Sequence, residues 1–177
     1  YHKYKYICRD NIIKIINVRD TSFPILNQIP STHFVKAISF NECGNLLALL
    51  QVDGMLKIFK RIENEPAPQL YKTFIGPKSD INGKFQISWK NTSLSVLYGS
   101  KILRIYETAT WTIKAEFFEN EMQFVQLISN EAAFVANSEK ISIYSIAANQ
   151  LIASSSCENI ESSSFAAFGH CSAFIFD

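Results

Sequence analysis

The sequence predicts an all-β fold made of repeated antiparallel sheets. Short apolar runs, rich in β-branched and aromatic residues, alternate with polar turns along most of the 177 residues. No stretch of about ten residues has a 3.6-residue apolar period, so we expect few helices. Equivalent apolar pairs also recur at spacings of 43, 47 and 38 residues, which indicates a structural repeat: Ile15-Ile16, Ile58-Phe59, Ile105-Tyr106 and Ile143-Tyr144.

The chain begins partway through one repeat. Residues 4–8 and 12–18 predict two strands joined by a turn, and residues 23–29 predict a third. Pro24 would place this third strand at a sheet edge, because proline has no N–H to donate inside a sheet. Since Tyr1 already falls within a strand-like run, we expect the chain to be a segment of a longer protein.

The clearest repeat lies between residues 33 and 61. Three strands are predicted there, at residues 35–40, 46–52 and 55–59. The run at 46–52 is nearly all apolar, which is typical of a strand buried on both faces. The Asp53-Gly54 dipeptide that follows it predicts a tight two-residue turn with positive φ.

The later strands follow the same order of strand, turn and strand. They are predicted at residues 69–75, 85–89, 94–98, 102–106, 110–118, 124–128, 132–136, 141–146, 150–153, 165–168 and 173–176. Turn-forming residues predict loops at residues 63–68 and 76–83. We interpret the serine-rich segment 154–164 as a connection between repeats.

These repeats resemble those of the WD40 β-propeller family over nearly the whole chain. In place of the family's Trp-Asp pair the chain has Ile16-Asn17, Phe59-Lys60, Tyr106-Glu107 and Tyr144-Ser145. The family's tight-turn aspartate survives as Asp53, with Asp10 a looser counterpart, whereas its Gly-His dipeptide is absent. His33 lies out of the usual register. We therefore expect the polar network that links Asp, His and Trp in such blades to be missing or partial.

The resemblance implies a WD40-like β-propeller with about four blades, as part of a larger, seven-bladed propeller. A single partial propeller would occupy residues 1–177. The implied blades, of which the first and last are incomplete, are residues 1–30, 33–75, 84–118, 122–154 and 162–177.

A narrower likeness concerns the order of three segments, IIKIINV, ISFNECGNLLALLQVDGMLKIF and ISWKNTSLSVLYGSKILRIYETATW. This order is similar to the N-terminal propeller of the replisome adaptor family that couples the replicative helicase to polymerase alpha. The step from Tyr106 to Trp111 is among its best parts. The likeness implies a role in DNA replication in the nucleus. The alternative resemblance is to translation initiation factors of the 2A type, which implies a nucleic-acid-associated propeller.

Motifs and composition favour a noncatalytic protein of a reducing compartment. No apolar run reaches the roughly 18 residues that span a bilayer, and no signal peptide is present, so we expect no membrane partner. The four cysteines have no metal-ligand spacing: Cys8, Cys43, Cys157 and Cys171. Glu119 and Glu121 are expected in a solvated turn. We expect no enzyme activity, metal, cofactor or small-molecule substrate, and an intracellular location in nucleus or cytoplasm.

The charge is unevenly distributed along the chain. Residues 1–118 carry an excess of seven positive charges, and residues 119–177 an excess of six negative charges. The sequence leaves open whether these are solvated blade edges or faces that steer different partners. We expect a protein–protein interaction scaffold that binds a peptide or domain, with loops 63–68 and 78–83 as secondary surface. Candidate contacts for an acidic partner are Arg9, Lys36, Lys57, Lys60 and Arg104.

Nucleic acid is the less favoured partner. Residues 1–19 interleave basic residues with tyrosines, which would suit a surface that tracks phosphates and stacks on bases. Lys3 and Lys5 alternate with the tyrosines, however, and this is the pattern of a half-buried strand. Trp89 and Trp111 are expected to pack between or within sheets, with Trp111 the more exposed of the two.

Overall fold

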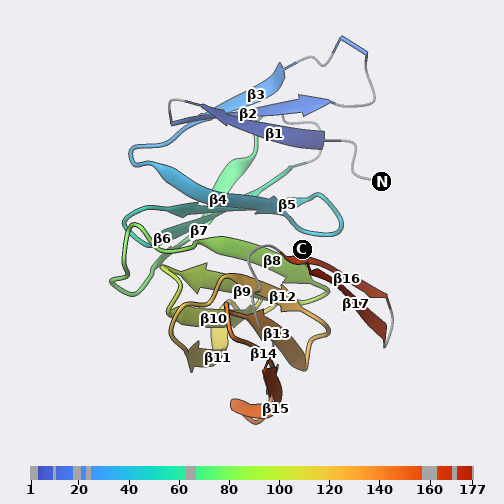
Figure 1. The fold of residues 1–177 in the computed structure, drawn as a ribbon. Helices are drawn as coiled ribbons and strands as arrows, with labels where there is room; N and C mark the ends of the chain where they lie inside the picture. The colour runs from blue at the N-terminus through green and yellow to red at the C-terminus, as the bar shows by residue number, and fades with distance from the viewer. Residues whose placement is uncertain are drawn as a thin grey trace. The chain divides into compact units, whose positions relative to one another are not determined.

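The computed structural model describes residues 4–9, 11–17, 21–22, 25–62, 67–156, 163–168 and 171–176. Within these residues every regular element is a β-strand, and the strands form five antiparallel sheets (Figure 1). The chain divides into two compact units, Tyr1–Ile81 and Asn82–Asp177. We call these unit 1 and unit 2, and number the sheets 1 to 5 along the chain.

Unit 1 contains sheets 1 and 2. Sheet 1 has the order β1-β2-β3, formed by β1 (Tyr4–Arg9), β2 (Ile12–Asn17) and β3 (Ile25–Pro30). Sheet 2 has the order β4-β5-β6-β7, formed by β4 (Val35–Phe40), β5 (Leu46–Gln51), β6 (Met55–Lys60) and β7 (Gln69–Ile75). The strands predicted here are confirmed within a few residues. β3 does lie at a sheet edge, although Pro24 is outside the described residues and the strand ends at Pro30 instead.

Unit 2 contains sheets 3, 4 and 5. Sheet 3 consists of β8 (Gln86–Lys90), β9 (Ser93–Tyr98), β10 (Ile102–Glu107) and β11 (Thr112–Phe118). Sheet 4 consists of β12 (Phe124–Leu127), β13 (Ala132–Ala136), β14 (Lys140–Ser145) and β15 (Gln150–Ser156). Sheet 5 pairs β16 (Ser163–Phe168) with β17 (Cys171–Phe176). The expected connection at 154–164 is therefore shorter than predicted, because strands extend into it from both ends.

A β-bulge recurs at the same place in sheets 1 to 4. The pairing between the last two strands of each sheet shifts register at the four residue pairs that the sequence spacing marked as equivalent: Ile15/Ile16, Ile58/Phe59, Ile105/Tyr106 and Ile143/Tyr144. In each case the extra residue lies on the last strand of the sheet: Leu26, Tyr71, Lys114 and Ile152. A bulge increases local twist and bends an edge strand away from regular pairing. The spacing seen in the sequence thus marks a structural repeat.

The turn after β5 differs from the prediction. β5 is buried on both faces as expected, but three residues rather than two separate it from β6. Gly54 N–H donates to the Gln51 carbonyl at 3.0 Å, and Gly54 has φ of +82°. Asp53 does not have a positive φ, which a two-residue turn of the predicted type requires at both central positions. Its carboxylate instead accepts a hydrogen bond from the Met55 N–H at 3.1 Å.

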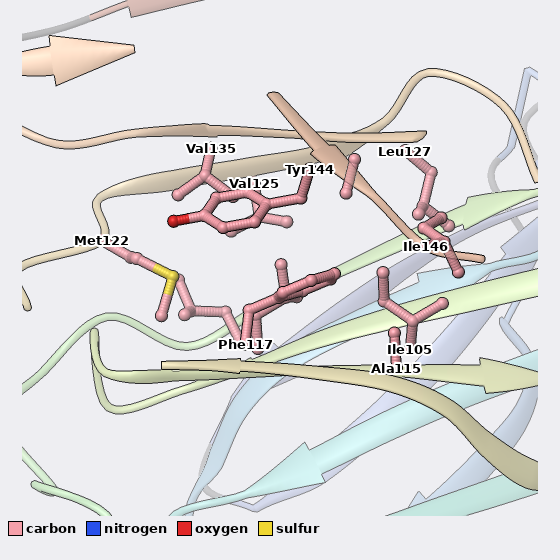
Figure 2. Packing of buried hydrophobic residues seen from close by; sticks show 12 residues of the cluster. Ile105, Ala115, Phe117, Met122, Val125, Leu127, Val135, Tyr144 and Ile146 are labelled. Carbon is pink, nitrogen blue, oxygen red and sulfur yellow. The ribbon is translucent and has the colours of Figure 1, made fainter. Parts of the chain in front are cut away.

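Each unit has its own apolar core. In unit 1 the buried side chains come from sheets 1 and 2: Ile13, Ile15, Ile29, Leu47, Leu49 and Phe59. In unit 2 the core lies between sheets 3 and 4, and Figure 2 shows Phe117 and Tyr144 pointing toward one another across it. Their ring centroids lie 4.6 Å apart. Two sheets that bury facing apolar surfaces in this way stabilise one another chiefly through the hydrophobic effect.

Candidate functional site

The five basic residues expected to contact a partner come from three sheets and from both units. Lys36 lies on β4, Lys57 and Lys60 lie on β6, and Arg104 lies on β10 in the other unit. Arg9 ends β1, and its side chain is outside the described part of the structure. Their contact with a partner stays a prediction. The expected loop at 63–68 is described only at residues 67 and 68.

The three lysines of sheet 2 have different surroundings. Lys36 is exposed and is the extra residue where the β4–β5 register shifts. Lys57 is half-buried and pairs in register with Leu49 and Thr73. Lys60 is exposed at the end of β6. Since Lys57 and Lys60 are three positions apart on one strand, their side chains leave opposite faces of the sheet.

Arg104 is engaged within its own sheet. Its guanidinium donates from Nε to a Glu116 carboxylate oxygen, and it lies 5.9 Å from the centroid of the Tyr98 ring. Burial alone would lower the pKa of Arg104, but hydrogen bonds with Glu116 and Tyr106 outweigh this effect and raise the pKa. The Glu116 carboxylate offsets the positive charge of Arg104 and therefore weakens the attraction of Arg104 for an acidic partner.

Tyr98 and Tyr106 form a buried hydroxyl pair in sheet 3. Their hydroxyl oxygens lie 3.1 Å apart, and both side chains are buried. Burial, followed by the neighbouring Tyr106, raises the pKa of Tyr98. Tyr98 therefore stays protonated in the folded protein well above the ordinary tyrosine range.

A basic and aromatic cluster on β6 and β7 was not predicted from the sequence. The ammonium groups of Lys60 and Lys72 each lie 5.6 Å from the centroid of the Tyr71 ring. Tyr71 is 47% exposed and Leu70 is 56% exposed. We call Lys60, Leu70, Tyr71 and Lys72 the β7 patch. In the sequence, the one signal for this patch is the mixture of basic and apolar residues in the run 69–73. The bulge that places Tyr71 beside both lysines depends on strand pairing and cannot be read from that run.

Glu119 is not in a solvated turn, so that prediction is wrong. Its carboxylate is only 8% exposed and accepts hydrogen bonds from the Tyr144 hydroxyl at 2.6 Å and the Asn137 amide at 3.4 Å. Lys140 Nζ lies 2.6 Å from the same carboxylate. Burial, followed by the hydrogen bond to Glu119, raises the pKa of Tyr144. Glu121, in contrast, is exposed, with a φ of 60°.

These contacts bear on the expectation that the polar network linking Asp, His and Trp in such blades is missing or partial. In unit 2 a polar network is present but made of different residues, with Tyr144 at the place of the family's tryptophan and Glu119 in the connection between sheets. In unit 1 it is partial: His33 Nδ1 lies 3.5 Å from Asp53 Oδ2. Each of these contacts gives a polar group a partner, and a buried polar group without a partner costs about 1–3 kcal/mol.

The tryptophan expected to be exposed is the buried one. Trp111 is 9% exposed and packs edge-on against the half-buried Trp89, with ring centroids 6.5 Å apart. Its φ of 60° is a strained conformation for a bulky residue. Burial of the indole in the turn between β10 and β11 offsets this strain, which costs about 1–3 kcal/mol.

The described side chains include no recognisable catalytic arrangement. His33 is the one histidine among them, and its Nδ1 contacts both Thr32 Oγ1, at 3.0 Å, and Asp53. A catalytic relay needs its acid and its nucleophile on different ring nitrogens, so these three residues do not form one. No group of three or more His, Cys, Asp or Glu side chains in this part of the chain could hold a metal ion.

Cys43 is a free, exposed thiol, whereas the side chains of Cys8, Cys157 and Cys171 lie outside the described residues. No helix long and apolar enough to cross a membrane occurs among the residues that could be searched.

Comparison with known proteins shows the fold. No family model and no curated protein matches the sequence. Among solved structures, Sqt1 of Saccharomyces cerevisiae is similar with a TM-score of 0.73 and 13% identity, over 91% of this chain and 48% of that chain. The WD40 domain of Toxoplasma gondii coronin gives 0.72 and 13%, over 87% and 43%. The structure of U3-55K gives 0.67 and 14%, over 85% and 47%.

The chain thus spans about half the length, or slightly less, of these solved structures. Their likeness confirms the predicted fold class: the sheets are blades of a WD40-like β-propeller. At this level of identity the comparison establishes the fold alone, and the partners of those proteins are not transferred to this chain.

Proposed function

We propose that this chain is a noncatalytic platform that binds other proteins. The observation that carries the proposal is the WD40-like propeller fold, whose blades present loops and strand edges from a rigid frame. A rigid surface favours binding because the partner alone loses conformational freedom on association.

The junction between sheets 3 and 4 illustrates this rigidity. The side-chain amide of Gln86 on β8 donates to the Val125 carbonyl at 2.9 Å and accepts from the Val125 N–H at 3.0 Å. It therefore bridges the first strands of two adjacent blades with the pattern of a backbone ladder. The Glu119 network ties the connection between the same blades to β14. Such cross-links hold the loops on these blades in place.

The chemistry of the surface favours an acidic protein partner. Exposed lysines, among them Lys36 and Lys60, lie in the first part of the chain, where basic residues are in excess. Charge complementarity of this kind raises association rates and sets specificity. Lys57 is the third proposed contact on sheet 2, and Arg9 and Arg104 are the contacts proposed outside it.

The proposed setting is a multiprotein complex in the nucleus or cytoplasm. Its specific form, an adaptor in the replisome, rests on the likeness of three sequence segments to the adaptor that links the helicase to polymerase alpha. The alternative, a propeller associated with nucleic acid as in initiation factors of the 2A type, rests on the basic, tyrosine-rich segment 1–19. Most side chains of that segment lie outside the described residues.

Affinity purification of the full-length protein at two salt concentrations tests the proposal. We expect a stoichiometric protein complex that survives the higher salt, and polymerase and helicase subunits in it would support the replisome role. Recovery of nucleic acid alone, lost at higher salt, would overturn the proposal, because phosphate contacts are steeply salt-dependent. The variant Lys36→Glu/Lys57→Glu should weaken the binding of an acidic partner. Unchanged affinity at low salt would show that neither lysine belongs to the interface.

A further inference from the structure

The β7 patch combines two cations with exposed apolar surface. Tyr71 is the extra residue of the bulge in β7, and the ammonium groups of Lys60 and Lys72 both lie over its ring. Leu70, next to it, is more than half exposed. Among the described strands, β7 pairs with β6 alone and forms the last strand of sheet 2. The patch thus lies on an accessible edge of the sheet.

In the described part of the structure, the charge of the patch is not balanced by a nearby carboxylate. Within the described part of the chain, neither Lys60 nor Lys72 forms an ion pair, and the Tyr71 ring is the one group that each is seen to contact. An aromatic ring attracts an ammonium group but cannot neutralise it. Both lysines therefore keep N–H donors and a positive field available for an anionic ligand.

An edge lysine also has a simpler role, since charged residues on an outer strand prevent edge-to-edge aggregation. That role needs charge alone, of either sign, and does not need an exposed aromatic ring between two cations. The two explanations differ in their response to charge reversal, which would keep the edge protected but remove an anion-binding site.

From these features we propose that the β7 patch is the docking site for an acidic linear peptide with interspersed apolar residues. This rests on the proposed scaffold function and specifies where and how one partner binds. Carboxylates of the peptide contact Lys60 and Lys72, which the Tyr71 ring holds side by side, and an apolar side chain of the peptide packs on Leu70. A peptide fits better than a nucleic acid because ammonium groups already lie over the Tyr71 ring, where a base would stack.

Fluorescence anisotropy with a labelled peptide of repeated Asp-Leu-Glu units, at low salt, provides the test. The variant Lys60→Glu/Lys72→Glu should lose about tenfold or more in affinity. The control Lys84→Glu/Lys101→Glu makes the same charge change at two exposed lysines outside the patch and should lose less than about threefold. Circular dichroism should show that both variants keep their β content.

Further variants separate the ring from the charge. Tyr71→Phe keeps the aromatic ring and should bind nearly as the parent does, whereas Tyr71→Ser should lose roughly threefold to tenfold. Replacing both acidic residues of the peptide by Asn and Gln should abolish binding. The variant Glu63→Gln/Glu65→Gln changes the two acidic residues that follow Lys60 in the sequence and should bind the peptide at least as tightly.

Several results would overturn the proposal. Equal losses in the patch and control variants would show that only net charge matters. Tighter binding of labelled oligothymidylate than of the peptide, abolished by the same patch variant, would assign the patch to nucleic acid. If the complex purified from cells survives in Lys60→Glu/Lys72→Glu while the peptide does not bind the parent, the scaffold function stands and the patch is not its site.

Discussion

The Glu119 network should contribute measurably to the stability of unit 2. Replacing Tyr144 with Phe removes only the hydroxyl that donates to the Glu119 carboxylate at 2.6 Å and keeps the ring that packs on Phe117. A hydrogen bond to a charged group contributes about 1.5–3 kcal/mol. Because Glu119 is only 8% exposed, water cannot fully replace the lost donor. We therefore expect Tyr144→Phe to lower the free energy of unfolding by about 2 kcal/mol.

Two further variants define the magnitude. Lys140→Gln should cost at most about 1 kcal/mol, since Lys140 is 41% exposed and solvent screens its ion pair with Glu119. In a Glu119→Ala background, Tyr144→Phe should cost less than about 0.5 kcal/mol, because the hydroxyl no longer has its carboxylate partner. The difference between the two backgrounds gives the coupling energy between Glu119 and Tyr144.

Urea unfolding followed by tryptophan fluorescence is the appropriate assay. The two tryptophans of the chain, Trp89 and Trp111, both belong to sheet 3 and therefore report on unit 2. The dependence on denaturant should not change between variants, since the surface exposed on unfolding is the same. A loss below about 0.5 kcal/mol for Tyr144→Phe, or equal losses in both backgrounds, would refute the assigned role of the network.

Three other outcomes are expected. Because the pKa values of Tyr98 and Tyr144 are raised in the folded state, unit 2 should keep its stability up to about pH 10 and lose about 1.4 kcal/mol per further pH unit for each tyrosine. In the double variant Tyr98→Phe/Tyr144→Phe, the loss of unfolding free energy above pH 10 should be smaller. An equal loss in parent and variant, measured by urea unfolding at several pH values, would contradict this. Gln86→Leu should lower the free energy of unfolding by about 1–3 kcal/mol and speed hydrogen exchange at the Val125 amide, because the Val125 N–H and carbonyl both lose their partner. An unchanged exchange rate, measured by mass spectrometry, would argue against the bridge. Gly83→Ala should cost more than about 2 kcal/mol in the same urea assay, because a Cβ there would overlap the backbone of the β9–β10 turn; a variant as stable as the parent would disprove the overlap.

Strand positions were predictable because they depend on local patterns. The apolar run of β5 and the turn residues around it lie within a few positions of one another, so a short window of sequence contains the information. The repeat spacing was predictable for a related reason. The residues at each bulge, such as Ile58 and Phe59, occupy equivalent places because each blade packs its apolar residues in the same way.

Side-chain environments were less predictable. Glu119 has the sequence context of a solvated turn, and its burial follows from the approach of Tyr144, 25 residues later. Trp111 follows Thr108-Ala109-Thr110 in the turn between β10 and β11, and its burial depends on Trp89 on β8. The β7 patch likewise depends on the register between β6 and β7, which places Lys60 beside Tyr71.

The all-β class, the order of the strands and the blade repeat could be read from the sequence alone, because alternation of apolar and polar residues acts over a few neighbouring positions. Which polar groups are buried, and which cations share an aromatic ring, depends on the tertiary structure. Those arrangements arise where strands distant in the sequence meet, and the register of their pairing fixes each side chain's neighbours. The proposed function therefore follows from the fold, whereas the proposed peptide site follows from one bulge in one outer strand.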